Sequence, residues 1–259
     1  MKIRYKILLA STWGAVATGI VCVAVSRSTL RTQGIEQTRN AMRTALIGAE
    51  SVRDSFSAMG ETGVLQKEHL LSDFRAIKTA GGDVTGTALY QTIPIIAGWR
   101  ALDTVSRQQG FSLRVAKENA RNPKNVPTAE DTRILAALER QKGDEYFEVN
   151  EALGEMFYAR PIILTKDCLS CHGDPAKSAS GDGKDIFGQK MEGWKVGEAH
   201  GAFILKQSTR EIDRFVKEST QTMLLVVALV GVISLGVSLW IVAHVLRGFA
   251  AIEATLSER

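Results

Sequence analysis

Two cysteines and a histidine stand close together at Cys168, Cys171 and His172, in the order C-x-x-C-H. One copy of this motif can bond two thioethers to the two vinyl positions of a porphyrin and place the histidine under its iron, which is the attachment pattern of haem c. The motif therefore predicts one covalently attached haem c. Cys168 and Cys171 would supply the thioethers, and His172 would be the proximal iron ligand.

Two other kinds of site use the same residue types. A redox dithiol needs C-x-x-C where a helix dipole lowers a thiol pKa, and it gains nothing from the histidine that follows. A structural zinc ion takes four Cys or His ligands, but the chain has no second C-x-x-C, and His69 and His200 are isolated in the sequence. The haem hypothesis is favoured over both.

The ligand on the opposite face of the iron stays open at this stage. His200 and Met59 are candidates, and so is an open or water-bound position. An open site would take up nitric oxide, carbon monoxide or oxygen, whereas two protein ligands would favour electron transfer or redox sensing.

Other residues are candidates for holding the porphyrin. The planar guanidinium group of arginine matches a carboxylate with two parallel hydrogen bonds, and aromatic rings can pack on the macrocycle. The candidate propionate partners are Arg114, Arg121 and Arg160, and the candidate packing residues are Tyr158 and Trp194.

Two stretches without Asp, Glu, Lys or Arg, residues 7–25 and 223–245, are long enough to cross a membrane, since a spanning helix needs about 20 apolar residues. The first is longer than the usual core of a signal peptide and lacks a good cleavage site, so a retained anchor is favoured over a cleaved leader. Both spans would contact membrane lipid.

The basic residues among positions 1–6 favour a cytoplasmic N-terminus. Because haem c is attached outside the cytoplasmic membrane, residues 26–222 are predicted to form a periplasmic domain of a bacterial inner-membrane protein. Residues 246–259 are then a short cytoplasmic tail, too small for a signalling output domain. Basic and acidic residues are interleaved and the net charge is only +4, so no nucleic-acid partner is expected.

The elements that must position the motif change in character along the chain. Between residues 35 and 59 apolar or small residues recur every seven positions, a pattern typical of a helix that pairs along one side; Gly60 and Gly63 end it, and a homodimer is predicted. The central region mixes short helices with alternating strands, which predicts an α+β fold. We expect a helix at 88–110 interrupted at Pro94, strands at 111–115, 144–150, 155–164 and 198–207, and helices at 131–141, with Thr128 as N-cap, and at 206–222.

Three stretches in order, residues 114–131, 157–175 and 193–203, resemble the periplasmic c-haem PAS-like sensor domain of bacterial chemoreceptors and histidine kinases. The resemblance covers roughly residues 30–207. It implies a PAS-like domain held between two transmembrane helices that senses redox state or a small haem ligand. Some members use a cysteine as the second axial ligand, but this chain has no cysteine between Cys22 and Cys168.

The resulting hypothesis is a membrane-anchored haem c sensor, not an enzyme. It would pass a periplasmic signal, as in chemotaxis and other signal transduction, to a cytoplasmic chemoreceptor, kinase or cyclase that is not on this chain. The alternative is a membrane-anchored monohaem c-type cytochrome for electron transfer. The many strands favour the sensor, whereas the short tail favours the carrier.

Overall fold

The computed structural model describes residues 2–257, except for the side chains of residues 2–12, 15, 246 and 248–257. The described residues divide into two compact units: residues up to 36 together with those from 210 onward, and residues 37–209. In chain order the main elements are α1 (Lys2–Glu61), α2 (Lys67–Thr79), α3 (Ala88–Gln91), α4 (Pro94–Gln109), β1 (Ser112–Ala116), α5 (Ala129–Gln141), β2 (Tyr146–Asn150), β3 (Glu155–Ile163), α6 (Leu169–His172), β4 (Ala199–Ser208) and α7 (Arg210–Ser257), with single turns of 3-10 helix at Val84–Gly86, Pro123–Asn125, Lys166–Cys168 and Pro175–Lys177.

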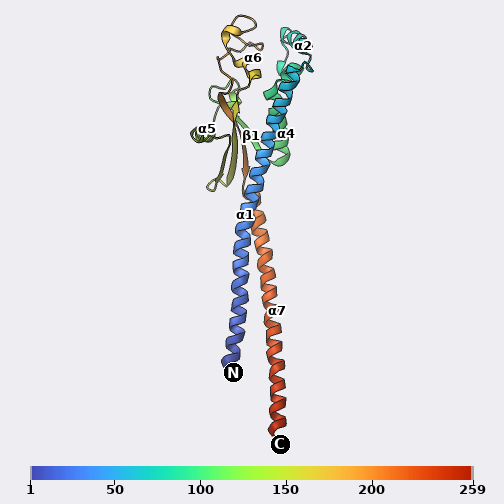
Figure 1. The fold of residues 1–259 in the computed structure, drawn as a ribbon, viewed down its shortest axis with the longest axis vertical. Helices are drawn as coiled ribbons and strands as arrows, with labels where there is room; N and C mark the ends of the chain where they lie inside the picture. The colour runs from blue at the N-terminus through green and yellow to red at the C-terminus, as the bar shows by residue number, and fades with distance from the viewer. Residues whose placement is uncertain (1, 258–259) are drawn as a thin grey trace. The chain divides into compact units, whose positions relative to one another are not determined.

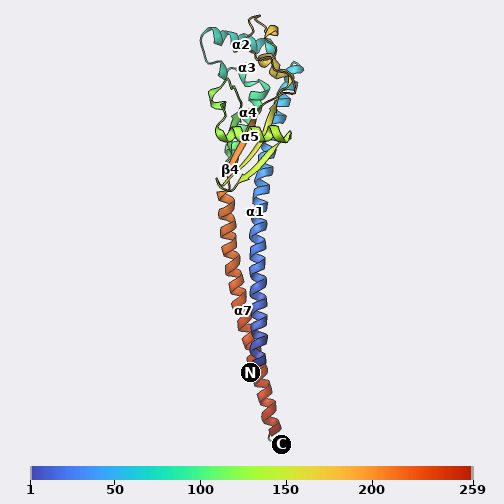
Figure 2. The same ribbon diagram turned by 90° about the vertical axis from the view of Figure 1, so that its left-hand side faces the viewer.

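The first unit is a pair of helices, the N-terminal part of α1 and the whole of α7, which lie side by side (Figures 1 and 2). Gly19 makes the approach close, since a Cβ on it would lie 2.6 Å from Cγ1 of Val227. Arg31 and Asp213 form an ion pair of 3.1 Å across the same two helices. A small residue at the contact and a charge pair near one end therefore hold this pair of helices together.

One segment of α7, Arg210–Val245, is long and apolar enough to cross a membrane, and none of its most apolar part is buried. It contains the predicted span at 223–245. The predicted span at 7–25 falls partly on residues 7–12 and 15, whose side chains lie outside the described residues, and it stays a prediction. The helix predicted to begin at Lys206 begins at Arg210 instead, because Lys206 to Ser208 are still paired in the sheet.

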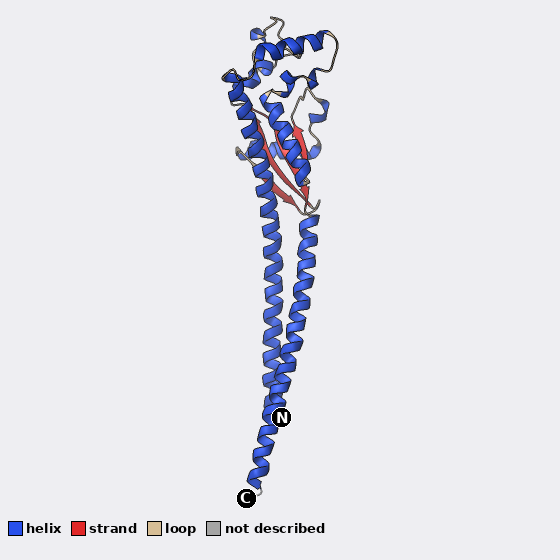
Figure 3. Cartoon of the chain, turned by 90° about the vertical axis from the view of Figure 1, so that its right-hand side faces the viewer, coloured by secondary structure: helices blue, strands red, loops and turns tan. Residues whose placement is uncertain are grey.

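The second unit is built on a four-stranded antiparallel sheet of order β1-β4-β3-β2. Figures 2 and 3 view it from opposite sides, with α5 in front in one and α1 and α4 in front in the other. Alternation along β3 sends Tyr158 to the α1 and α4 side and Phe157 to the α5 side, so each face carries its own apolar cluster. The predicted α+β class is confirmed.

Local signals place the helix ends where the sequence predicts them. Pro94 occupies the first turn of α4, where its missing N–H costs nothing. Thr128 caps α5: its hydroxyl accepts from the backbone of Asp131, and the Asp131 carboxylate accepts in return from the Thr128 backbone. The short apolar stretches between these signals pair as the four strands.

Part of the heptad pattern of α1 packs against other elements of the same chain. Met42, Ala45, Leu46 and Ala49 are buried in the cluster formed with α4 and the sheet. At Gly98 the two helices touch so closely that a Cβ would lie 2.6 Å from the carbonyl oxygen of Ala49. This part of the stripe packs against its own domain, and the predicted homodimer stays a prediction.

Candidate functional site

The C-x-x-C-H motif lies directly after β3. A turn of 3-10 helix at Lys166–Cys168 leads into α6, a single helical turn that ends at His172. Gly173 closes the turn, its N–H donating to the carbonyl of Leu169 at 3.0 Å. A Cβ on Gly173 would lie 2.5 Å from that same oxygen. The glycine after the histidine is therefore required for the turn that brings Cys168, Cys171 and His172 together.

The loop that follows folds back on the motif. The N–H of Gly193 donates to the carbonyl of Gly173, and that of Trp194 donates to the carbonyl of His172, each at 2.9 Å. Asp185 organises the loop from within, since its carboxylate accepts from the backbone of Phe187 and Gln189 at 2.9 Å. These bonds carry Glu192 and Trp194 to the side chain of His172.

His172 is held on both its edge and its face. Its Nδ1 lies 2.8 Å from Oε2 of Glu192, and the Trp194 ring stacks on it with centroids 4.4 Å apart and an interplanar angle of 10°. Burial lowers the pKa of His172, and the hydrogen bond to Glu192 opposes that only in part. A neutral imidazole with its proton on Nδ1 has its lone pair on Nε2. No described residue forms a hydrogen bond with Nε2.

Arg121 fixes this arrangement from the loop after β1. It donates to both carboxylate oxygens of Glu192 at 2.8 and 2.9 Å, to Asp185 at 2.7 Å, and to the carbonyls of Cys171 and Lys190 at 3.0 and 2.7 Å. Burial lowers the pKa of Arg121, but the bonds to Glu192 and Asp185 outweigh it, so the pKa is raised. Burial likewise raises the pKa of Glu192, yet Arg121 and His172 leave it below its usual value.

Two further side chains contact the Trp194 ring. The His200 ring stacks on it at 4.0 Å and 12°, and Nζ of Lys117 lies 3.4 Å from its ring centroid. Lys117 follows β1, and it reaches this place because β1 pairs with β4. Gly201, at φ +84°, allows β4 to approach the end of β1 this closely, since a Cβ there would lie 2.4 Å from the carbonyl oxygen of Ala116.

Lys117 is a site residue that the sequence analysis missed. Burial lowers its pKa to about 8, although the Glu192 carboxylate raises it in part. Among the described residues no carboxylate pairs with its ammonium group. The sequence held one signal for it. If the predicted strands at 111–115 and 198–207 pair, the chain that follows the first strand lies beside His200 in the second.

Cys171 lacks the surroundings of a reactive thiol. Burial raises the pKa of Cys171, and the bond from Ser170 and the charge of Arg121 oppose that only in part. The helix after Cys168 is a single turn. A nucleophilic cysteine needs the opposite shift, towards the thiolate. The shift at Cys171 is away from the thiolate.

The part of the chain that carries the motif also matches a known protein family. Residues 24–208, well over half of the sequence, match the family model described as Tll0287-like. The chain belongs to the Tll0287-like family. The matched range includes the C-x-x-C-H motif, Arg121, Glu192 and Trp194. No curated protein matches the chain.

A solved structure is also similar to this Tll0287-like chain. It is described as the crystal structure of the cyanobacterial haem protein Tll0287, with 19% sequence identity and a TM-score of 0.37. The match covers 59% of this chain and 95% of that one.

Two predicted propionate partners of the Tll0287-like chain have carboxylate partners elsewhere. Arg114 donates to Asp131 at 2.7 Å, at the start of α5. Arg160 donates to Glu50 on α1 at 2.9 and 3.3 Å. Arg121, the third, is the residue that the structure brings to the motif.

Tyr158 and Met59 lie elsewhere in the Tll0287-like domain. Tyr158 is fully buried in the cluster between the sheet, α1 and α4, and its hydroxyl donates to Glu145. Met59 is 40% exposed near the end of α1. His200, the other candidate for the sixth position, is separated from His172 by the Trp194 ring.

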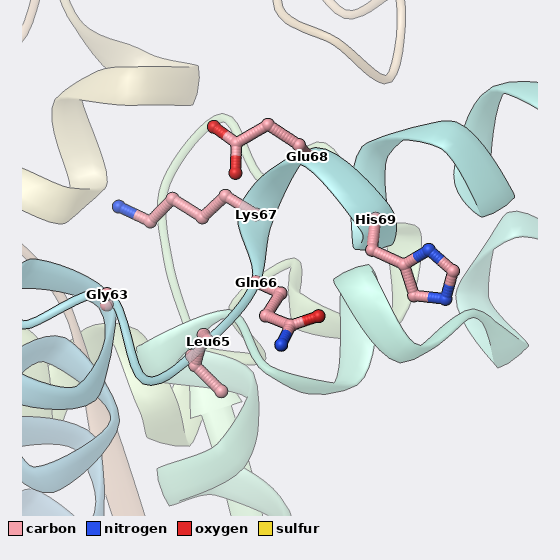
Figure 4. Close-up of a pocket in the computed structure, with 7 residues that line it drawn as sticks. Gly63, Leu65, Gln66, Lys67, Glu68 and His69 are labelled. Atoms are coloured by element: carbon pink, nitrogen blue, oxygen red, sulfur yellow. The ribbon is translucent and has the colours of Figure 1, made fainter.

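A separate hollow of about 400 Å³ lies between the end of α1 and the start of α2. Figure 4 shows its polar side chains pointing in different directions, with His69 turned away from Gln66 and Lys67. In the described part of this Tll0287-like chain no group of three or more His, Cys, Asp or Glu side chains could hold a metal ion. The hollow therefore offers no converging set of ligands.

Proposed function

We propose that this chain is a membrane-anchored haem c protein that senses redox state or a small haem ligand on the periplasmic side of a bacterial inner membrane. The observation that carries the proposal is a C-x-x-C-H motif whose histidine is partly buried, with Nδ1 engaged by Glu192 and Nε2 left available. That is the tautomer in which a histidine binds a metal through Nε2. The family assignment supports it, because the cyanobacterial protein Tll0287 is described as a haem protein.

The residues around the motif suit a haem. Cys168 and Cys171 would hold it through thioethers, and Nε2 of His172 would bind the iron. When bound, a haem supplies a one-electron redox change and a position that can take up a small ligand. Lys117, the partly buried cation beside Trp194, is the proposed partner for a haem carboxylate, because the three arginines predicted for that role are already bonded to carboxylates of the protein.

Several contacts join the motif to α1 within the domain. Arg160 on β3 pairs with Glu50, Arg53 donates to the carbonyl of Ile163 at 3.5 Å, and Ser57 donates to Asp167, next to Cys168. A change at the haem would therefore act first on this part of α1. We propose that it reaches the membrane through α1 and α7.

The remaining parts of the proposal concern topology and partners. The domain, of PAS-like type, would sit between two spans at residues 7–25 and 223–245, with both termini in the cytoplasm. It would work as a homodimer, without enzymatic activity, and pass its signal to a cytoplasmic chemoreceptor, kinase or cyclase on another chain. The apolar segment of α7 supports the second span.

The first test is a peroxidase-type haem stain on a denaturing gel, with visible spectra of the purified chain. We expect a stained band, its loss in Cys168→Ala/Cys171→Ala, and its retention in Cys22→Ala, which removes the cysteine outside the motif. Free thiols at Cys168 and Cys171 in unstained protein from a haem-maturing host would refute the proposal.

A second measurement separates a sensor from an electron carrier. In the Cys22→Ala background, spin labels on exposed positions of α1 and α7 should report different distances with oxidised, reduced and carbon monoxide-treated protein. Identical distances, together with rapid exchange of electrons with a quinol or a reductase, would identify the carrier instead.

A further inference from the structure

Glu192 acts on His172 from the side away from the expected metal. Its carboxylate accepts from Nδ1 at 2.8 Å, whereas a metal would bind Nε2. A carboxylate on one nitrogen makes the other a more basic ligand, and a more basic axial ligand favours the more highly charged state of an iron centre. Glu192 can therefore influence a bound iron through the imidazole without touching it.

The position of Glu192 is set by a second layer of contacts. Arg121 holds both of its oxygens, at 2.8 and 2.9 Å, and is itself anchored on Asp185, whose side chain is fully buried. A further bond runs from Arg121 to the carbonyl of Cys171 at 3.0 Å. The carboxylate, the imidazole and the backbone of the motif thus form one connected group drawn from three segments of the chain.

We infer that Glu192 is a positioning residue of the haem site, which fixes His172 with its proton on Nδ1 and lowers the reduction potential of the iron, and that Arg121 holds Glu192 in place. The inference rests on the proposed function, because it needs a haem iron at Nε2. Reduction takes one electron from an external one-electron donor. No proton is transferred, since the Nδ1 proton stays between His172 and Glu192 in both states.

The test is a spectroelectrochemical titration of the full haem-loaded chain in detergent, comparing the natural protein with Glu192→Gln. The amide oxygen can still accept from Nδ1 but carries no charge. We expect the midpoint potential to rise, with the ratio of reduced to oxidised protein at a fixed potential changing about tenfold, which is ~59 mV for one electron. Haem content should stay the same, because Cys168 and Cys171 are unchanged.

Glu198→Gln is the matched control. Glu198 accepts from Nε2 of His200 at 3.1 Å, so this variant removes the same charge and also a carboxylate–histidine pair, but one that does not include the proposed iron ligand His172. We expect a much smaller change in midpoint. Equal shifts in the two variants would overturn the inference, because net charge alone would then explain them.

The outcomes separate the inference from the proposed function. A haem-loaded Glu192→Gln protein with an unchanged midpoint would overturn the inference and leave the haem assignment intact, whereas a natural protein without haem would refute the assignment itself. If Glu192→Gln does not accumulate, Glu192→Asp replaces it. The shorter carboxylate cannot span His172 and Arg121 in the same way, so its midpoint should also rise, and an unchanged value would count against the inference.

Discussion

At the scale of single residues, the same side-chain types have different roles according to their partners. Two histidines stack on the two faces of Trp194, but only His172 offers Nε2, since the Nε2 of His200 is bonded to Glu198. Arginines differ in the same way. Arg121 serves the motif, whereas Arg160 ties β3 to α1.

Tyr158 gives a prediction at this scale. Burial, and next the bond to Glu145, raise the pKa of Tyr158 to about 12. The unfolded chain releases this proton near pH 10, so the stabilisation is complete below pH 10 and is lost as the pH rises towards 12. Tyr158→Phe should unfold more easily at pH 7 by about 1.5 kcal/mol, the low end for a hydrogen bond to a charged group, and should lose less stability above pH 10.

Chemical denaturation of the chain in detergent at pH 7 and at pH 11 measures both effects. Tyr90→Phe is the control, because its ring packs on Phe187 and no described residue forms a hydrogen bond with its hydroxyl. The bond to Glu145 would not be the cause of the stabilisation if both variants lost the same free energy of unfolding at pH 7. The same would follow if Tyr158→Phe lost as much stability above pH 10 as the natural protein.

At the scale of elements, the sheet and its covering helices decide where the loops meet. β1 and β4 pair so that Lys117 and His200 lie at the same end of the sheet. β3 delivers the motif beside them, and α1 and α4 cover the face that Tyr158 occupies. The site is therefore assembled from loops at the ends of strands, on a packed support.

The crossing of α1 and α4 gives the second prediction. Gly98→Ala would place a Cβ 2.6 Å from the carbonyl of Ala49, and overpacking of this kind costs about 1–3 kcal/mol. Gly48→Ala, on an exposed position of α1 with nothing within 4 Å, should instead stabilise the protein by about 1 kcal/mol, the difference in helix propensity. The midpoint of thermal unfolding, followed by circular dichroism, should fall in Gly98→Ala and rise in Gly48→Ala. A shift in the same direction in both variants would contradict the close packing.

At the scale of the whole molecule, the two units differ in how they place their apolar side chains. The domain buries its apolar residues in two clusters on either side of the sheet. The apolar side chains of α7 instead remain exposed along the segment that could span a membrane. The proposed span would place these side chains in lipid, whereas water around so many apolar side chains would be unfavourable.

Topology reporters test this arrangement. Alkaline phosphatase inserted in the exposed loop at 178–182 should be active, and a fluorescent protein fused after Arg259 should fluoresce. Val230→Arg with Ile233→Arg should abolish that fluorescence, since a charge at the centre of a span costs about 2.5–3.5 kcal/mol. Phe215→Arg, on α7 before the stretch 223–245, should preserve it. Fluorescence that survives the double substitution would contradict a span at this place.

The sequence alone determined the features that depend on neighbours along the chain. The C-x-x-C-H spacing, the Thr128 cap, the break at Pro94 and the apolar stretch at 223–245 are local patterns, and the α+β class follows from where such patterns begin and end.

Only the tertiary structure decided which side chains surround His172. Arg121 and Glu192 are 71 positions apart, and their meeting depends on strand pairing and on a loop that folds back on the motif. The same dependence placed Lys117 at the site, and it gave Arg114 and Arg160 carboxylate partners elsewhere. A pattern of residue types can predict which residue binds a metal. Contacts between distant segments determine where that residue carries its proton, how its ring is oriented and which charges lie beside it.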